Sequence, residues 1–416
     1  MNKFNIALLH YSCPPVVGGV EEVVRQQASL FYRYFHKVKI FAGAGGQFTS
    51  DYEIEINPLL ASGNEEVHNA HQSLMQGDTK PLAQLADRIE RYLREALTNF
   101  DILIAHNVLT MKYNLPLTIA LRQLADKNFI HIISWNHDSH YFYPEYETFL
   151  DNSPWNILRE PHPNICYVAI SENRREMFQQ LYHATKSIVV IPNGIDPIRF
   201  FRLDPVTVRL IQEQRLFAED FLMVQPSRLH PRKNIELSVR VVRALQEKGL
   251  QARLLVTGAY DPHEPGTKDY YHNLVKLAEQ LDVKEDVLIM AEYQLKSGEQ
   301  LQIDRIIMRD LYLIADILFI PSIQEGFGIP LLEAGMLKLP VVCSDISPFR
   351  EIGGNDVCRF RLEDSPAQIA QKILDFTSGI PTHHFFRRVI NQYAWDNIYH
   401  KYLLPLIQKI LKENRQ

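Results

Sequence analysis

The sequence predicts an α/β protein made of two doubly wound domains, each with helices packed on a parallel sheet. Three observations predict this fold class. Apolar, strand-like runs alternate with helical runs in the first half of the chain, and the same alternation starts afresh in the second half. The chain is also 416 residues long, more than a single hydrophobic core usually serves. We therefore place a domain boundary near residue 195, where the run VIPNGID leads into a polar connection.

In the first half, apolar runs rich in β-branched residues predict strands, and amphipathic runs predict helices. The expected strands are 4–10, 37–43, 101–107, 128–136, 164–171 and 187–196. The expected helices are 21–35, 81–97 and 116–126, and the polar stretch 45–75 is expected to be a connection.

In the second half the same signals return. The expected strands are 221–228, 252–258, 286–293, 315–322 and 339–345, with helices between them. The clearest helix, 235–249, ends at a glycine, which commonly terminates helices. The expected domains are therefore 1–195 and 196–384, followed by a helical segment at 385–416.

Composition excludes several classes of protein. A formal net charge of −5 gives no reason to expect nucleic acid or an anionic membrane as the main partner. The first residues lack the apolar region of a signal peptide, and no apolar run approaches the ~18 residues of a membrane span. Four scattered cysteines without a CxxC pair favour a reducing compartment. We expect a cytoplasmic protein.

The most informative segment is PSIQEGFGIPLLEAG, residues 321–335, which follows the apolar run 315–320. A strand, a glycine-bearing loop and then a helix beginning near Pro330 place a phosphate-binding helix end at the ligand edge of a sheet. Glu325 on the loop and Glu333 one turn into the helix could accept hydrogen bonds from hydroxyl groups on either side of that phosphate. This pattern suits a nucleotide sugar. The alternative is an ordinary strand–loop–helix unit with solvated glutamates.

Two other strand-to-helix loops carry candidate ligand groups. Gly18 and Gly19 precede a helix after the first strand, so that backbone N–H groups could meet a phosphate or a sugar. In the second half, PSRLHPRKN brings Arg228 and Lys233 to the end of a strand, where two cations could neutralise a diphosphate leaving group. The plainer alternatives are a tight connection at the glycines and a solvated Arg232–Lys233 pair.

A polar cluster follows the strand at 128–136. His137 and Asp138 stand where substrate contacts are expected, and His137 could hydrogen-bond a sugar hydroxyl. His137 and His140 could also form a metal pair, although no further ligand set is evident. Tyr141 and the neighbouring aromatic residues could form a stacking platform for a sugar acceptor, or they could be buried against the sheet.

Other mechanisms have little support in the sequence. The chain has no G-x-x-x-x-G-K-[ST] phosphate loop and no G-x-S-x-G nucleophile motif. Glu325 and Glu333 could in principle be a glycosidase pair. Both lie in one short segment beside a helix N-terminus, however, which suits a phosphate ligand better than a glycosidic bond.

Assembled in order, these segments resemble the retaining glycosyltransferases of family GT4, which have the GT-B fold. The matching runs are VVGGVEEVV, NHD, VIPNGID, PSRLHPRKN and PSIQEGFGIPLLEAGMLKLPVVCSD, and Glu325 and Glu333 have the E-x7-E spacing of that family. The resemblance covers nearly the whole chain. It implies two Rossmann-like domains facing each other across a cleft, an acceptor-side one at 1–195 and a donor-binding one at 196–384, with helices in 385–416 crossing back to the first domain.

The resemblance also implies residue roles. The catalytic groups would be His137, Arg228, Lys233 and Glu325. The donor would be bound by Gly18, Gly19, Arg228, Lys233, Glu325, Gly326, Phe327, Gly328, Ile329, Leu331 and Glu333. Asp138 and Tyr141 would lie on the acceptor side, and Asn193 and Asp196 would shape the crossover between the domains. No metal or other cofactor is expected, because arginine and lysine would stabilise the leaving diphosphate.

The expected reaction is retaining transfer of a hexose to a hydroxyl group of a small molecule, a glycan or a lipid. UDP-glucose and GDP-mannose are the leading donors. Tyr293 stands where many relatives have glycine, which leaves the nucleobase open. The alternatives are a non-catalytic nucleotide-sugar-binding protein on the same fold, and a membrane-peripheral enzyme that uses the aromatic and basic segment 30–39. No nucleic-acid partner is expected, and the sequence predicts no oligomeric state.

Overall fold

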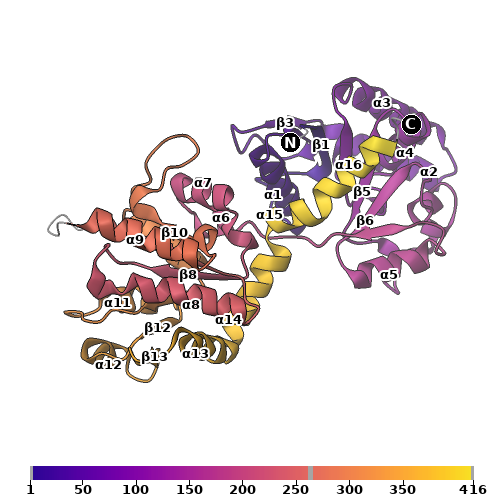
Figure 1. Cartoon of the computed structure of the whole chain (residues 1–416). Coiled ribbons are helices and arrows are strands. Elements are labelled where there is room, and N and C mark those ends of the chain that lie inside the picture. Colours follow the sequence, from indigo (N-terminus) through magenta and orange to yellow (C-terminus); the bar gives the residue numbers. More distant parts are fainter. Residues whose placement is uncertain (1–2, 261–265, 414–416) are drawn as a thin grey trace. The chain divides into compact units, whose positions relative to one another are not determined.

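The computed structural model describes residues 3–260 and 266–413. The chain forms two compact units (Figure 1): unit 1 contains Met1–Ile195 and Trp395–Gln416, and unit 2 contains Asp196–Ala394. Each unit is a doubly wound α/β domain. The chain returns to unit 1 at Trp395, so that residues 385–394, expected with the first domain, belong to unit 2.

Unit 1 is built on seven parallel strands in the order β3-β2-β1-β4-β5-β6-β7. The strands are β1 (Asn5–Ser12), β2 (Lys37–Ala44), β3 (Glu53–Ile56), β4 (Ile102–His106), β5 (His131–Asn136), β6 (Ile165–Ala169) and β7 (Ile188–Val190). The main helices are α1 (Gly19–Arg33), α2 (Glu65–Met75), α3 (Lys80–Ala96), α4 (Leu115–Asp126), α5 (Glu172–Leu181), α15 (Trp395–Ile398) and α16 (Leu404–Glu413).

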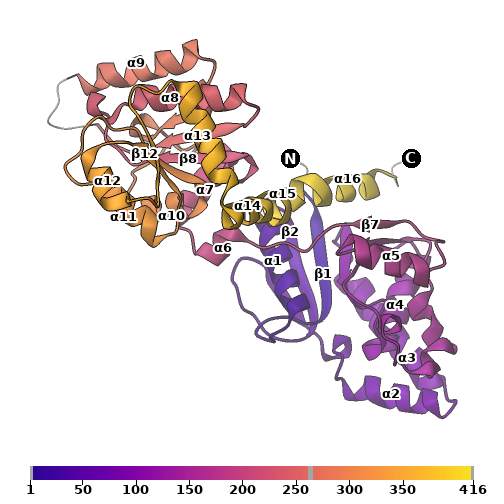
Figure 2. The same ribbon diagram turned by 90° about the horizontal axis from the view of Figure 1, so that it is seen from below.

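Both faces of this sheet are buried, as the near-continuous apolar strands require. Along β1, Ala7 and Leu9 join a core shared with α2–α5, whereas Ile6 and Leu8 join a core shared with α1 and the C-terminal helices. Figure 2 shows α15 and α16 beside the strands, with α15 against α1.

The C-terminal segment is fixed to unit 1 by specific contacts. Trp395 Nε1 donates to Gln26 Oε1 at 2.6 Å, and Asp396 pairs with Arg33 at 2.8 Å. The Tyr399 ring stacks on the Tyr34 ring, with centroids 4.0 Å apart. These contacts make the segment part of the first unit's core.

Unit 2 is built on six parallel strands in the order β10-β9-β8-β11-β12-β13. The strands are β8 (Phe221–Gln225), β9 (Ala252–Val256), β10 (Val287–Ile289), β11 (Ile317–Ile320), β12 (Val341–Ser344) and β13 (Cys358–Phe360). The helices are α6 (Pro197–Phe201), α7 (Pro205–Gln214), α8 (Ile235–Glu247), α9 (Thr267–Gln280), α10 (Arg305–Ile314), α11 (Ile329–Met336), α12 (Ser347–Gly353), α13 (Pro366–Ser378) and α14 (Pro381–Arg388).

The strand orders fix where ligands can bind. In each sheet the winding reverses between two neighbouring strands, β1 and β4 in unit 1 and β8 and β11 in unit 2. Parallel doubly wound sheets bind ligands beyond the carboxyl ends of their strands at this switch point. The loops that follow these four strands carry most of the residues singled out in the sequence.

Some elements differ from the sequence-based expectation. The polar stretch 45–75, expected to be a connection, contains strand β3 and helix α2. Its helix was missed because only Val67 and Ala70 of α2 are buried, which leaves almost no apolar stripe. The expected strand 221–228 ends at Gln225, after which the chain turns into a ligand-side loop.

The segment 30–39, with its aromatic and basic residues, is the end of α1 and the start of β2. Leu30 and Phe31 are fully buried, whereas Phe35 is 76% exposed. Across residues 3–260 and 266–413, the helices are all too short or too polar to cross a membrane.

Candidate active site

A cavity of about 260 Å³ lies at the switch point of unit 2, between the loop after β8 and the loop after β11. These two strands pair directly, with Ile317 beside Met223 and Leu318 beside Val224. The cavity is lined by Gln225, Pro226, Ser227, Lys233, Ile320, Glu325, Phe327, Gly328, Ile329, Pro330 and Phe349.

The loop after β8 is held by Gln225, the last residue of that strand. Gln225 is fully buried; its Nε2 donates to the Lys233 carbonyl at 3.0 Å, and its Oε1 accepts from Ser238 Oγ of α8 at 2.6 Å. The Lys233 amide donates in turn to the His230 carbonyl at 2.9 Å. The backbone of Lys233 is therefore fixed at the cavity by hydrogen bonds on both sides.

The loop after β11 is tied to the loop after β8. The Ile323 amide donates to the Arg232 carbonyl at 2.8 Å, which joins the two loops directly. Ser344 Oγ, at the end of β12, donates to the Ser322 carbonyl at 2.5 Å. These bonds bring Glu325 opposite Lys233.

Lys233 and Glu325 form an ion pair, and their side chains are only 16% and 15% exposed. Glu325 Oε1 accepts both from Lys233 Nζ and from Ser322 Oγ, the latter at 2.7 Å. Within the described residues, Glu325 Oε2 has no hydrogen-bond partner, and the lysine ammonium carries two further N–H groups. The pair therefore offers an acceptor for a hydroxyl group beside donors for an anion.

Gly328 shapes the entry to α11. Its φ of +121° is a conformation that other residues adopt only with strain, and a Cβ there would lie 3.0 Å from Phe349 Cε1. The Leu331 amide, expected to face the ligand, donates instead to the Gly328 carbonyl at 3.0 Å, and Pro330 has no amide hydrogen. Among the described residues, the amides of Gly328 and Ile329 have no partner and remain available at this positive helix end.

The remaining predicted donor residues lie outside the cavity lining. Glu333 is exposed on α11, and its Oε2 accepts from the buried Tyr312 hydroxyl at 3.2 Å. Arg228 is exposed, while Gly326 faces open space, where a Cβ would meet no atom within 4 Å. The structure thus brings Lys233, Glu325, Phe327, Gly328 and Ile329 together at the cavity, and leaves Arg228, Gly326, Leu331 and Glu333 outside its lining.

Tyr293 is bonded to α7 through its hydroxyl group. Its hydroxyl accepts from Gln214 Nε2 at 2.7 Å and donates to Glu213 Oε2 at 3.3 Å. The Lys296 amide donates to the same Glu213 carboxylate at 3.0 Å. The long polar loop that follows β10 is therefore anchored on unit 2's own helix.

In unit 1, the protonation state of His137 follows from its neighbours. Trp135 Nε1, which can only donate, contacts Asn193 Oδ1 at 3.3 Å, so that Asn193 Nδ2 faces His137 Nδ1 at 3.4 Å. His137 Nδ1 is then an acceptor and Nε2 carries the proton. Burial lowers the pKa of His137 to about 3, which keeps the ring neutral. His137 Nε2 is buried and has no partner among the described residues.

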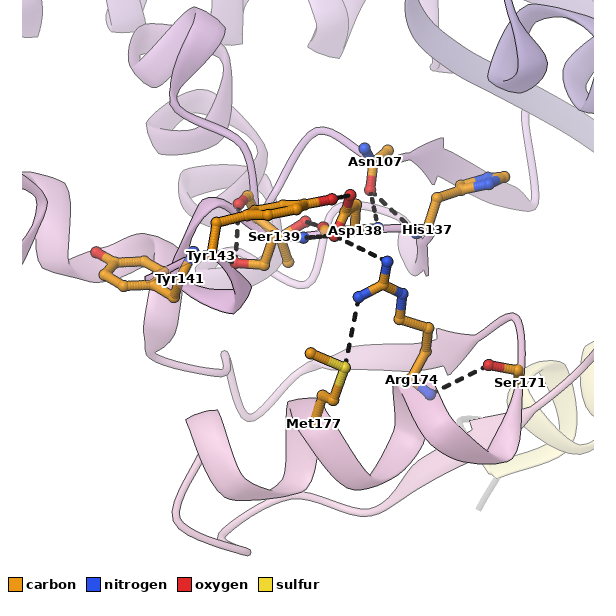
Figure 3. A network of polar contacts seen from close by, with 10 residues as sticks. Asn107, His137, Asp138, Ser139, Tyr141, Tyr143, Ser171, Arg174 and Met177 are labelled. Atoms are coloured by element: carbon orange, nitrogen blue, oxygen red, sulfur yellow. Dashed lines mark hydrogen bonds and ion pairs between the residues drawn. The ribbon is translucent and has the colours of Figure 1, made fainter. Parts of the chain in front are cut away.

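Asp138, next to His137 in the chain, belongs to a polar network with Tyr143 and Arg174 (Figure 3). Its carboxylate accepts from the Tyr143 hydroxyl at 2.5 Å and pairs with Arg174 at 3.3 Å. Asn107 Oδ1 accepts from the amides of His137 and Asp138, at 3.0 and 2.9 Å, and so fixes the turn. In Figure 3 the His137 ring points away from Arg174.

Tyr141 has a structural partner. Its hydroxyl donates to the Leu150 carbonyl at 2.5 Å, and its ring packs against Tyr146. Tyr143, one of the neighbouring aromatic residues considered for a stacking platform, is the more exposed of these side chains, at 51%. No three His, Cys, Asp or Glu side chains within residues 3–260 and 266–413 come together in a way that could hold a metal ion, so His137 and His140 do not gain further ligands.

The glycine turn after β1 meets a carboxylate. A Cβ on Gly18 would lie 2.0 Å from Glu21 Oε2, whereas Gly19 faces open space. Glu21 Oε1 accepts from Ser12 Oγ at 2.5 Å and lies 3.8 Å from His10 Nε2. Burial lowers the pKa of His10, although the His106 carbonyl and Glu21 oppose the shift.

Sequence reasoning missed several functional candidates. In unit 2 these are Gln225, Ser322 and Tyr312, and in unit 1 His10 and Arg174. Ser322 could have been found, because it lies three residues before Glu325 in the same loop. No motif or spacing in the sequence indicated Tyr312 or Arg174, because each lies on a helix distant in sequence from the residue that it contacts.

Two doubly wound parallel units, with a helix N-terminus and a lysine–glutamate pair at the switch point of unit 2, match the GT-B fold of glycosyltransferases. Comparison with family models agrees: the model described as Glycosyltransferase Family 4 matches residues 17–199, and the model described as Glycosyl transferases group 1 matches residues 208–388. The chain belongs to glycosyltransferase family 4.

Similar proteins include two mannosylglucosylglycerate synthases. The one from Petrotoga mobilis is 23% identical over 369 residues, which cover 83% of each chain. The one from Thermotoga maritima is 24% identical over 282 residues, 65% of this chain and 62% of that one. Among solved structures, a sucrose-phosphate synthase from Thermosynechococcus elongatus aligns over 99% of this chain and 100% of its own, with 16% identity and a TM-score of 0.41.

Proposed function

We propose that this glycosyltransferase transfers a hexose from a nucleotide diphosphate sugar to a hydroxyl group, with retention of the anomeric configuration and without a metal ion. The observation that carries the proposal is the Lys233–Glu325 pair at the cavity of unit 2, with Ser322 on the same carboxylate oxygen. It sets a cation and an unpartnered carboxylate oxygen beside a helix N-terminus, which matches a ligand with a phosphate next to a sugar.

The diphosphate would be bound by cations and amides. Lys233 Nζ donates to one phosphate oxygen with the N–H groups that Glu325 does not use, and Arg228 contributes a second cation from the same loop. The amides of Gly328 and Ile329 add neutral donors at the positive end of α11. Fixed donors of this kind stabilise the charge that develops on a leaving phosphate, so the scheme requires no metal.

The sugar and the ribose would be bound by the two glutamates. Glu325 Oε2 accepts from a hydroxyl of the transferred hexose, while its other oxygen stays on Lys233 and Ser322. Glu333 accepts from the ribose hydroxyls, with Tyr312 holding one carboxylate oxygen in place. The neutral His137 offers its Nε2 hydrogen to a donor sugar near the reacting carbon.

In the transfer step, the acceptor oxygen forms a bond to the anomeric carbon as the bond from that carbon to the diphosphate oxygen breaks. The acceptor proton passes to the departing phosphate oxygen on the same face of the sugar, so the configuration is retained. UDP-glucose and GDP-mannose are the proposed donors, in keeping with the mannosyl and glucosyl groups in the names of the two synthases. We place the reaction in the cytoplasm, where the four scattered cysteines stay reduced.

The proposal is tested by following nucleoside diphosphate release and the product's anomeric signal by NMR. Lys233→Ala and Glu333→Ala should abolish transfer while the far-ultraviolet circular dichroism stays that of the parent chain. Arg232→Ala is the matched control, because it removes a neighbouring exposed cation. Unchanged turnover in both site variants, or a product of inverted configuration, would contradict the proposal.

A further inference from the structure

A cavity of about 550 Å³ lies at the amino edge of unit 1's sheet, opposite the loops that follow the strands. It is lined by Lys3, Phe4, Asp101, His131, Gln408, Leu411 and Lys412. The starts of β1, β4 and β5 adjoin here, because Ile102 of β4 pairs both with Ile6 and with His131. The last turns of α16 form the remaining wall. Since β1 has eight residues and spans roughly 25 Å, the cavity is well separated from the carboxyl edge.

Two cations and an amide at this cavity are available to a ligand. Within the described residues, the side chains of Lys3, Gln408 and Lys412 have no hydrogen-bond or ion-pair partner. Each ammonium group carries three N–H donors, and the amide of Gln408 carries two. The two lysines come from opposite ends of the chain, and the cavity brings them together.

The cavity also has one fixed acceptor. Asp101 Oδ2 accepts from the Asn5 amide at 2.7 Å, which orients the carboxylate, and Oδ1 has no hydrogen-bond partner among the residues that the structure describes. His131 adds no third cation, because burial lowers its pKa, although Asp101 opposes the shift. The lining therefore offers two positive charges opposed by a single carboxylate.

This lining excludes several kinds of ligand. A nucleobase would need a free aromatic face, but the Phe4 ring is 8% exposed and stacks on His36, with centroids 5.3 Å apart. A metal ion would need more ligands than one carboxylate and one imidazole. A plain anion would satisfy the lysines but would face Asp101 with the same charge. A phosphate with a hydroxyl group beside it satisfies both sides, since the hydroxyl donates to Asp101.

We propose that this cavity binds a small phosphomonoester that carries an adjacent hydroxyl group, such as a sugar or polyol phosphate. Lys3 and Lys412 contact the phosphate, and Asp101 accepts from the hydroxyl. The bound ligand joins the start of β1 to the end of α16. The plainer role of Lys412 is to stabilise the last carbonyls of α16, which needs no ligand. The site is separate from the transfer reaction, so it stands or falls independently of the proposed function.

The test uses the full chain with glycerol 3-phosphate as the probe, and binding is followed by ³¹P line broadening. Every protein in the series carries Lys233→Ala, so that the cavity of unit 2 does not contribute. Adding Lys3→Ala or Lys412→Ala should weaken probe binding roughly fivefold or more, as expected for a lost charge-assisted contact, and Lys412→Arg should retain it. Lys409→Ala is the matched control, because Lys409 is exposed on the same helix outside the lining.

Two further measurements locate the probe. Asp101→Asn keeps an oxygen for the Asn5 amide but replaces the free acceptor with a donor, so it should reduce the preference for glycerol 3-phosphate over inorganic phosphate. The probe should also protect Lys3 and Lys412, but not Lys409, from acetylation by acetic anhydride, as read by mass spectrometry.

A phosphomonoester could belong to a soluble metabolite or to a lipid head group. Sedimentation with phosphatidic acid vesicles tells these sources apart: co-sedimentation that Lys412→Ala abolishes would assign the site to a head group, and probe binding without co-sedimentation would assign it to a soluble ligand. Absence of probe binding, equal binding in the Lys3, Lys412 and Lys409 variants, or an unchanged preference in Asp101→Asn would each overturn the proposal.

Discussion

Alanine at Gly328 should damage the donor site, whereas alanine at Gly326, two residues earlier in the same loop, should be harmless. Gly328 has φ +121° and ψ 44°, outside the region that residues with a side chain adopt readily. Its added Cβ would lie 3.0 and 3.1 Å from two atoms of the Phe349 ring. Gly326 has neither a positive φ nor any atom within 4 Å of an added Cβ.

The size of the effect follows from these contacts. A residue held in such a backbone conformation costs of order 1–3 kcal/mol. Phe349 is fully buried, so its ring has little room to move away from the new methyl group. If the loop keeps its conformation, unit 2 loses that free energy of unfolding. If the loop relaxes, the amides of Gly328 and Ile329 leave their positions, and donor affinity falls by roughly 5- to 150-fold.

Two measurements on each variant separate these outcomes: calorimetric titration with the nucleoside diphosphate that binds the parent chain, and thermal unfolding. Gly328→Ala should lose melting temperature, affinity or both. Gly326→Ala should match the parent chain or gain about 0.4–1 kcal/mol of stability from a less flexible unfolded chain. Parental values of both quantities for Gly328→Ala, or equal losses at the two positions, would show that neither the positive φ nor the Phe349 contact matters to the site.

Three further predictions concern ionisation, the ribose side and metals. Burial lowers the pKa of His10, His106 and His137, that of His137 from 6.5 to about 3, so the unfolded chain binds protons that the folded chain rejects. Stability should therefore fall as pH drops from 6.5 to 3, by roughly 1.4 kcal/mol per pH unit for His137 alone, and His137→Gln should make the measured slope shallower. Tyr312→Phe should raise the donor KM roughly two- to tenfold with kcat little changed, because a hydrogen bond to Glu333 worth about 0.5–1.5 kcal/mol is lost. An unchanged KM in steady-state kinetics would show that Tyr312 does not act on the donor site. Excess EDTA should leave the transfer rate unchanged, whereas a loss restored by Mg²⁺ would contradict the metal-independent scheme.

Local sequence pattern was enough to predict the two doubly wound units and to place Lys233, Glu325 and Gly328 on loops that line the cavity of unit 2. Lys233, Glu325 and Gly328 each stand in a short segment between a strand and a helix, where spacing along the chain nearly fixes the position in space. Gly328 in particular occupies a turn that requires a positive φ, which glycine adopts without strain.

The sequence pattern could not predict which polar groups of those loops are hydrogen-bonded within the protein. The Leu331 amide was expected at the ligand, but the first turn of α11 closes on it through the Gly328 carbonyl. Tyr141 was expected on the acceptor side, and the bond from its hydroxyl to the Leu150 carbonyl is a contact that the pattern did not predict. Both outcomes depend on the path of the backbone in three dimensions, which residue identity does not fix.

The sequence also did not predict contacts between residues that lie far apart along the chain. Tyr312 reaches Glu333 from α10, and Arg174 reaches Asp138 from α5. Each is an ordinary residue in its own segment. Only the three-dimensional fold, which sets which helices and loops are neighbours, reveals these contacts.

The proposed function depends above all on the cavity beside Lys233 and Glu325 holding the diphosphate of a sugar donor. Calorimetric titration of UDP and GDP into the parent chain, Lys233→Ala and Arg232→Ala measures this binding without relying on an acceptor. We predict that one of the nucleotides binds the parent chain and Arg232→Ala with equal affinity, and binds Lys233→Ala at least roughly tenfold more weakly, as expected for a lost charge-assisted contact. Equal affinity in Lys233→Ala and the parent chain would contradict the assignment of this cavity to the diphosphate.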